Sequence, residues 1–237
     1  MLRLFKKRDP LARLQEKRTE YLTHNPPELL KEHLWAALPA KSTPVEALSF
    51  LVVDFETTGF EAESNDIISI GWIEISGMQI DVASKQHLYI RNDKLINHET
   101  AVINHIVPKM LSQGITLDEA IASLLRCSTG KILVVHSQVI EKSFVDFYMQ
   151  NSLGIPAAPL LWIDTLIIEK WRAMQKEMHV GQDHRLSSAR KRYNLPNYAA
   201  HNALIDALST AELLLAQIAH IYRRRKATFE ELYSISQ

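Results

Sequence analysis

Two carboxylates stand two residues apart at the end of an apolar run, in the stretch Phe50-Leu51-Val52-Val53-Asp54-Phe55-Glu56. The apolar residues before Asp54 are typical of a buried strand. Because successive side chains of a strand point to opposite faces, Asp54 and Glu56 share a face and Phe55 points back into the protein. A lone pair of this kind is usually part of a solvated turn. If the pair is desolvated, however, its charges repel unless a cation lies between them, and Mg²⁺ or Mn²⁺ prefers such oxygen ligands.

A second pattern, Ala200-His201-Asn202-Ala203-Leu204-Ile205-Asp206, opens an apolar helical stretch that extends to about residue 221. Asn202 is a favoured N-cap, so we expect His201 in the preceding loop and Asp206 near the helix start. Alanines at positions 203, 207 and 211 form a smooth face that lets this helix lie close to a sheet. Histidine, with an ordinary pKa of about 6.5, is suited to accept a proton near neutral pH.

A third pattern lies between these two. The apolar run 131–135 predicts a strand that ends at His136, and the helix that follows carries Glu141. The plainer interpretation is an exposed helix residue for Glu141 and a capping or core residue for His136.

In this order, the three patterns resemble the three motifs of the DEDDh 3′-5′ exonucleases, the superfamily of the proofreading epsilon subunit of bacterial DNA polymerase III. The resemblance covers residues 50–211 and leaves both termini outside. It departs from the usual motifs at Glu141, where the family has Asp, and at Ser137, where the family commonly has Asn. The extra methylene of Glu141 displaces its oxygens, so we expect a changed metal preference or a lower rate.

The resemblance implies an α/β, ribonuclease H-like fold, in which helices flank a mixed β-sheet. It also implies a two-metal 3′-5′ exonuclease that releases nucleoside 5′-monophosphates from the 3′ end of DNA, with single-stranded DNA favoured. Two Mg²⁺ or Mn²⁺ ions would be held by four carboxylates: Asp54, Glu56, Glu141 and Asp206. His201 would take the proton of the attacking water and complete the catalytic set. The residues implied to contact the substrate are Thr57, Thr58, Gly59, Phe60 and His136.

Two alternatives remain open. The substrate could be RNA, as for exoribonucleases of the RNase T or oligoribonuclease type, because the motif residues do not reveal a contact to the 2′-OH. The protein could instead be a non-catalytic nucleic-acid-binding or adaptor module with a degenerate metal site. Glu141 is the feature that favours this second alternative, and the other motif residues oppose it.

The remaining patterns predict the elements that position these residues. We expect strands over 66–75 and 86–91 joined by a turn at Gly77, and helices over 96–105 and 117–125. Residues 160–166 should enter a long helix that reaches about Met174, with Asp164 as its N-cap. We expect His105 to be structural, and His179 and His184 to lie in a polar loop.

A short basic helix is expected over residues 185–195. Its cations are Arg185, Arg190, Lys191 and Arg192. A solvated face and a phosphate-binding face explain this run equally well.

Three segments follow from these boundaries: an N-terminal helical extension over 1–46, the exonuclease domain over 47–220 and a basic C-terminal tail over 221–237. Hydrophobic residues make up 46% of the 237 residues, which is ordinary for a folded protein with a real core. The 27 basic residues equal the 27 acidic residues, so any surface for nucleic acid must be a local one. The partner we expect is nucleic acid with a free 3′ end, and a protein partner or a homodimer stays open.

Cys127 is the single cysteine, which excludes an internal disulfide and is typical of a reducing cytosol. The chain has no apolar run of membrane-spanning length and no apolar signal core at its N-terminus. We therefore expect a cytoplasmic protein without a membrane segment.

Overall fold

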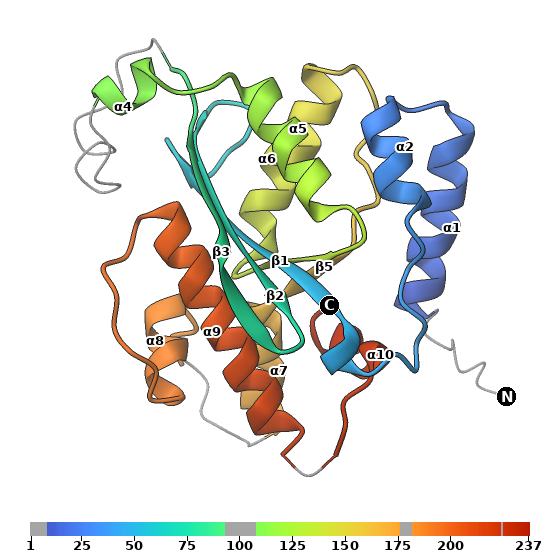
Figure 1. Cartoon of the computed structure of the whole chain (residues 1–237), viewed down its shortest axis with the longest axis vertical. Helices are drawn as coiled ribbons and strands as arrows, with labels where there is room; N and C mark the ends of the chain where they lie inside the picture. The colour runs from blue at the N-terminus through green and yellow to red at the C-terminus, as the bar shows by residue number, and fades with distance from the viewer. Residues whose placement is uncertain (1–8, 93–107, 176–181, 224) are drawn as a thin grey trace, which may run out of the picture.

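The computed structural model describes residues 9–92, 108–175, 182–223 and 225–237. A sheet of five strands, in the order β3-β2-β1-β4-β5, forms the centre of this part of the chain (Figure 1). The strand bounds are Ser49–Thr57 for β1, Ile67–Ser76 for β2, Gln79–Tyr89 for β3, Ile132–Val135 for β4 and Trp162–Asp164 for β5. The first three strands pair antiparallel, whereas β4 and β5 join β1 in parallel, so the sheet is mixed.

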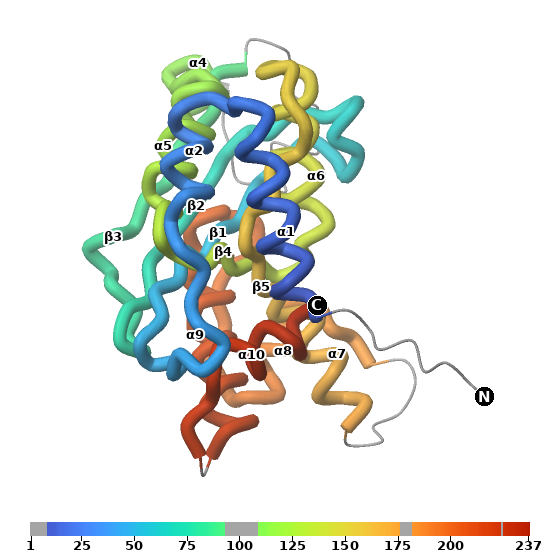
Figure 2. Tube along the Cα trace, turned by 90° about the vertical axis from the view of Figure 1, so that its right-hand side faces the viewer, coloured from blue at the N-terminus to red at the C-terminus, as the bar shows by residue number. Residues whose placement is uncertain are grey.

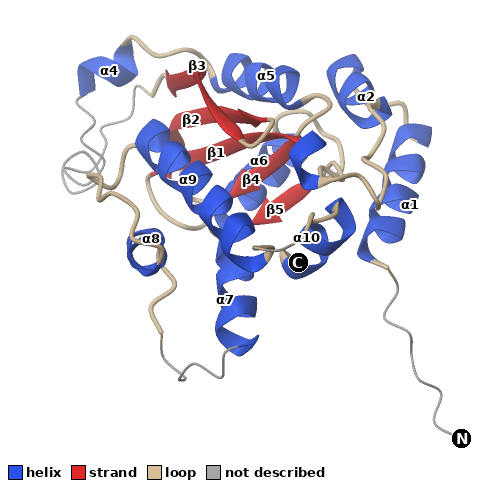
Figure 3. Ribbon diagram, turned by 60° about the horizontal axis from the view of Figure 1, so that its bottom comes forward, coloured by secondary structure: helices blue, strands red, loops and turns tan. Residues whose placement is uncertain are grey.

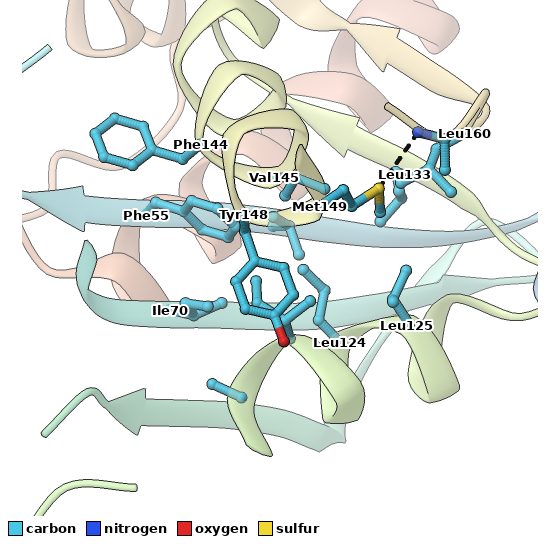
Figure 4. Close-up of a cluster of buried hydrophobic side chains, with 14 of the residues drawn as sticks. Phe55, Ile70, Leu124, Leu125, Leu133, Phe144, Val145, Tyr148, Met149 and Leu160 are labelled. Atoms are coloured by element: carbon cyan, nitrogen blue, oxygen red, sulfur yellow. Dashed lines mark hydrogen bonds between the residues drawn. The ribbon is translucent and has the colours of Figure 1, made fainter. Parts of the chain in front are cut away.

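One face of the sheet is covered by α5 (Leu117–Ser128) and α6 (Gln138–Asn151). Figure 4 shows Phe144 and Tyr148 of α6 beside the side chain of Phe55, with Leu124 of α5 in the same cluster. The backbone N–H of Ala158 donates to Sδ of Met149 at 3.3 Å, which ties the loop before β5 to α6. This face therefore takes the odd-numbered residues of β1.

The other face is covered by α9 (Ala203–Ile221) and α7 (Thr165–Gln175), which Figure 3 shows in front of the strands. Ala203, Ala207 and Ala211 of α9 are fully buried, because their small side chains let the helix lie directly on β1 and β2. Among the described helices, α9 is the one long and apolar enough to cross a membrane. Its packing against the sheet is that of a core helix.

The two ends of the described chain pack together. Helices α1 (Pro10–Thr23) and α2 (Glu28–Trp35) precede the sheet, with the 3₁₀ turn η1 (Val45–Ala47) leading into β1, and α10 (Phe229–Ile235) follows α9. The N–H of Phe229 donates to the carbonyl of Thr43 at 2.8 Å, and Lys41 forms ion pairs with both Asp9 and Glu230. Figure 2 shows the C-terminus beside the start of α1.

Most of the predicted elements are confirmed, with two corrections. The third strand begins at Gln79 rather than residue 86, because its pairing with β2 includes residues 79–81. Ile80 and Val82 alternate there with polar residues, a strand signal that the sequence interpretation missed. Residues 162–164 form the edge strand β5 rather than the entry of a helix, because pairing with β4 overrides the local pattern. The structure also has short helices α4 (Pro108–Ser112) and α8 (Leu186–Arg192). The helix predicted over 96–105, with His105 and also His179, lies outside the described residues.

Candidate active site

Strand β1 places its two carboxylates on the face that α9 covers. Asp54 and Glu56 follow Phe50 and Val52 in the alternation, and Phe55 is buried on the opposite face. In the antiparallel pairing with β2, Asp54 lies opposite Gly71 and Glu56 lies opposite Ser69. The shared face expected from the sequence is confirmed.

Helix α9 brings the third carboxylate to the same place. Asn202 caps the helix by accepting from the N–H of Ile205 at 3.2 Å, which leaves Asp206 in the first turn. The helix start lies directly on Gly71, because a Cβ atom there would stand 2.2 Å from the backbone nitrogen of Leu204. Since Gly71 is the strand partner of Asp54, this close approach sets Asp206 beside Asp54.

The three carboxylates Asp54, Glu56 and Asp206 offer oxygens that all lie within 4.8 Å of one another. Burial raises the pKa of each, with repulsion among the carboxylates adding to it at Asp54 and Glu56, and the pKa of Glu56 reaches about 8. Desolvated carboxylates this close favour a compact positive charge between them. This donor set of oxygens alone fits a hard divalent cation such as Mg²⁺ or Mn²⁺.

Glu141 reaches the cluster from the opposite side of the sheet. It lies in α6, is 4% exposed, and its Oε2 atom has no hydrogen-bond partner among the described residues. Burial raises its pKa to about 8, and hydrogen bonds from the backbone of Glu141 and Phe55, which favour the charged form, offset part of this rise. Glu141 is not part of the 4.8 Å group, although its charge raises the pKa of Asp54. An orphaned buried carboxylate oxygen beside three others is a further donor that a cation can use.

His201 borders the cluster from the loop before α9. Its backbone has a φ of 66°, and its N–H donates to Oδ2 of Asp206 at 2.8 Å. The side chain is exposed, and no hydrogen bond joins its ring to any described residue. His201 lines the two cavities at the carboxylates.

His136 lies at the end of β4 with both ring nitrogens in use. Nδ1 is 2.9 Å from the hydroxyl of Thr165, and Nε2 is 2.9 Å from the carbonyl of His184. Burial lowers its pKa, which favours the neutral ring. It lines both cavities at the carboxylates, so the substrate contact predicted for it would use its ring carbons.

Asp164 holds the start of two helices that flank the site. Its carboxylate accepts from the N–H groups of Ser137 and Gln138 at the start of α6, at 3.0 and 2.8 Å. It also accepts from the N–H of Leu166 at the start of α7, at 2.8 Å. The capping role expected for Asp164 is confirmed at α7, and the second cap orients the helix that carries Glu141.

A cavity of about 400 Å³ opens on one side of the carboxylates, and it contains the turn that follows β1. The hydroxyl of Thr57 donates to the carbonyl of Gly59 at 2.7 Å, and the hydroxyl of Thr58 accepts from the N–H of Asp66 at 2.9 Å. Phe60 is 78% exposed at its rim, as a surface for stacking requires. All four residues predicted in this turn line the cavity.

A second cavity, of about 620 Å³, shares Asp54, His201 and Asp206 with the first. It adds three cations that the first cavity lacks: Lys170, Arg185 and Arg190. The sequence interpretation missed Lys170 and also Gly71. A glycine inside an apolar strand pattern indicates that another backbone segment comes close at that position. The sequence shows this signal at Gly71.

The basic run of α8 divides between two environments. Arg185 is exposed, whereas Arg192 donates to Glu169 at 2.8 Å and Arg190 is 4% exposed and bonded within the protein. The run is therefore not one phosphate-binding face.

The part of the chain that holds these residues also matches known proteins. A family model described as "Exonuclease" matches residues 51–214. A PolC-type DNA polymerase III of Thermotoga maritima is 29% identical over 168 residues, 70% of this chain and 12% of the relative. DNA polymerase III subunit epsilon of Treponema pallidum is 28% identical over 178 residues, 74% of this chain and 79% of the relative. The chain thus spans about an eighth of the polymerase that it matches and most of the epsilon subunit.

Solved structures share the fold. The nuclease domain of 3′hExo, described as a DEDDh family member bound to rAMP, superposes with a TM-score of 0.63 over 78% of this chain and 98% of that one, at 14% identity. Exonuclease X, in complex with 5′ overhanging duplex DNA, gives a TM-score of 0.58 over 79% and 99%, at 19% identity. The mixed sheet with flanking helices is therefore the ribonuclease H-like fold of these exonucleases.

Proposed function

Because the chain belongs to the exonuclease family, we propose that it is a metal-dependent 3′-5′ exonuclease that removes nucleotides from the 3′ end of single-stranded DNA. The observation that carries this proposal is the group of three desolvated carboxylates, Asp54, Glu56 and Asp206, with oxygens within 4.8 Å of one another. The products would be nucleoside 5′-monophosphates.

The residues that would hold two divalent cations are these three carboxylates together with Glu141. Such cations supply charge stabilisation at the phosphate and make water more acidic. Asp54 and Glu56 are held by strand pairing and Asp206 by a capped helix, so the oxygens are set in place before a cation binds. The Oε2 atom of Glu141 has no hydrogen-bond partner among the described residues, so it is available as a ligand for a cation.

His201 is the group we assign to proton transfer. Its ring lines both cavities and is not engaged by any described residue, so it can accept the proton of the attacking water. The backbone bond from His201 to Asp206 keeps this base beside the carboxylates. Loss of such a base costs about 10²- to 10⁴-fold in rate.

The 3′-terminal nucleotide would occupy the smaller cavity. Thr57, Thr58 and Gly59 bring backbone and hydroxyl groups to its wall, and exposed Phe60 offers a stacking surface for the base. Lys170 and Arg185 in the larger cavity suit the phosphates of the remaining strand. The cytoplasm is the compartment we propose, on the single cysteine of the chain.

The experiment uses 5′-labelled single-stranded DNA and the matching RNA, each incubated with Mn²⁺, with Mg²⁺ or with EDTA. We expect a ladder that shortens from the 3′ end with either cation and no cleavage in EDTA. Asp54→Asn should abolish cleavage and weaken Mn²⁺ binding in calorimetry, whereas Glu63→Gln, which neutralises an exposed carboxylate in the segment between β1 and β2, should change neither.

Three results would contradict the proposal. Cleavage in EDTA or by Asp54→Asn would exclude the carboxylate site. A ladder from RNA alone would assign the substrate to RNA. No cleavage of either oligonucleotide by a folded, Mn²⁺-binding protein would favour the non-catalytic nucleic-acid-binding module.

A further inference from the structure

The position of the His201 ring depends on the backbone of its loop. Residues 194–202 connect Tyr193, the C-cap of α8, to α9 without a helix or strand, and the ring of His201 has no hydrogen bond to the described residues. The φ of 66° at His201 is costly for a residue with a side chain, by about 1–2 kcal/mol. Such a conformation persists only where the surroundings hold it in place.

Arg190 joins this loop to the middle of α9. One of its terminal nitrogens, Nη1, donates to the carbonyl of Ser209 at 2.5 Å. The other, Nη2, donates to the carbonyl of Pro196 in the loop at 2.8 Å and to Oε2 of Glu212 in α9 at 2.7 Å. A guanidinium with fixed fork geometry can make these three bonds at once, and a lysine could not place its donors in the same way.

Tyr198 closes the arrangement from the loop. Its ring lies under the Arg190 guanidinium, 4.8 Å from centroid to Cζ, and its hydroxyl donates to Oε1 of Glu212 at 3.0 Å. The two oxygens of Glu212 thus bind one residue of α8 and one residue of the loop. Glu212 lines neither cavity at the carboxylates, so it has no route to the substrate through them.

The loop is therefore held at two places, at Pro196 and Tyr198 and at His201 itself. Arg190 and Glu212 fix Pro196 and Tyr198 against α9, and the bond from His201 to Asp206 fixes the other end. Both fixed points lie on α9, which also carries the carboxylate of the site. The distance from the base to the carboxylates is then set by one rigid helix.

We propose that Arg190, Tyr198 and Glu212 are positioning residues that hold the 194–202 loop so that His201 stands at the carboxylates. This assignment rests on the proposed function. Arg190 and Tyr198 also line the larger cavity, and the three bonds of Arg190 within the protein assign it to the alignment of the base.

A double-mutant cycle tests whether these residues act through His201. Glu212→Ala should lower kcat by about 10- to 100-fold, because a misplaced catalytic group costs that much, with KM and Mn²⁺ affinity unchanged. In the His201→Ala background, Glu212→Ala should have no further effect on kcat. An equal loss in both backgrounds would overturn the proposal, because it would mean that Glu212 acts independently of His201.

Glu212→Ala also leaves the buried guanidinium of Arg190 without its carboxylate, which can destabilise the whole protein. The same cycle is therefore repeated with Tyr198→Phe, which removes one hydroxyl only. The matched control is Tyr193→Phe, which removes a hydroxyl bonded to Glu169 of α7 at 2.9 Å. Tyr198→Phe should lower kcat in the wild-type background only, and Tyr193→Phe should leave it unchanged. Equal losses in these two tyrosine variants would count against the proposal.

Hydrogen exchange measured by mass spectrometry gives a readout that needs no activity. Tyr198→Phe should speed exchange of the amides of residues 197–201 while the middle of α9 stays protected. Tyr193→Phe should leave that loop unchanged. Unaltered exchange in Tyr198→Phe would overturn the proposal, whether or not the wild-type protein cleaves DNA. Faster exchange in a protein that cleaves nothing would support the loop contact and contradict the proposed function.

Discussion

At the scale of single residues, the site is built from groups that destabilise the metal-free protein. Asp54, Glu56 and Asp206 are desolvated together, and burial raises the pKa of each. A buried carboxylate with no cation beside it holds its proton into the neutral range. In the proposed function, these carboxylates would serve binding and catalysis at the expense of the stability of the free protein.

Glu56→Gln tests this cost through its dependence on pH. The pKa of Glu56 is raised from 4.5 to about 8, so the folded state binds more protons than the unfolded state between these values. The stability associated with this proton is present below about pH 4.5 and is lost as the pH rises through about 8. In EDTA, Glu56→Gln should therefore raise the Tm more at about pH 9 than at about pH 5, by about 2–4 °C for each kcal/mol recovered.

The measurement is a calorimetric scan of both proteins at the two pH values. Glu63→Gln serves as the control for the loss of one charge, because Glu63 is exposed. The same difference in Tm at both pH values would show that Glu56 is not desolvated as the structure has it.

At the scale of elements, the site depends on how one helix meets one strand. Helix α9 approaches β2 at Gly71, where there is no room for a side chain. Gly71 lies opposite Asp54 in the sheet, so the first turn of α9 brings Asp206 close to Asp54. Helix α6 approaches from the opposite face and is held by Asp164. The carboxylates converge because both helices begin at the same end of the sheet as the last residues of β1.

Gly71→Ala should separate Asp206 from β1. The new Cβ would lie 2.2 Å from the Leu204 nitrogen, a backbone atom that cannot move without shifting α9. We expect a loss of about 1–3 kcal/mol in the free energy of unfolding, together with weaker Mn²⁺ binding. Urea unfolding and calorimetric titration measure the two effects.

Gly77→Ala is the matched control. Gly77 has a φ of 56° and no atom within 4 Å of an added Cβ, so its replacement costs backbone strain alone. The free energy of unfolding should fall by about 1–2 kcal/mol while the affinity for Mn²⁺ stays the same. Equal Mn²⁺ affinity in Gly71→Ala and wild type would refute the role given to the glycine.

At the scale of the whole molecule, the two termini complete the core away from the site. Phe229 and Leu232 of α10 are fully buried, and they share a cluster with Leu11 and Leu14 of α1 and with the α9 face of the sheet. The cations of the tail take part in local contacts, as in the ion pair of Arg225 with Glu231. The boundaries drawn at residues 46 and 220 stay a prediction, and residues from both sides of each share this core.

Phe229→Ala should therefore destabilise the protein without changing the site. Truncation of a buried phenylalanine costs about 3–5 kcal/mol in the free energy of unfolding. The kcat should be unchanged at temperatures where the variant stays folded. Val82→Ala, at a position 59% exposed in β3, is the control and should change the free energy of unfolding by less than about 0.5 kcal/mol. A loss as small in Phe229→Ala would show that the tail is not part of the core.

Much of the candidate site was predictable because its signals are local. The alternation around Asp54 and Glu56, the cap at Asn202 and the small residues of α9 all act within one element, and the structure confirms each of these local features. What the sequence determined by itself is therefore the type of these elements and which side chains share a face. Periodicity carries this information, because it depends only on neighbours along the chain.

The tertiary structure decided which side chains are paired and how far each one reaches. It buried Arg190 against Glu212, turned residues 162–164 into an edge strand, and brought Glu141 to the site from the opposite face of the sheet. Each of these outcomes depends on a partner many residues away. Burial and charge pairing are set by what packs against a residue, and a run of residue types does not contain that information.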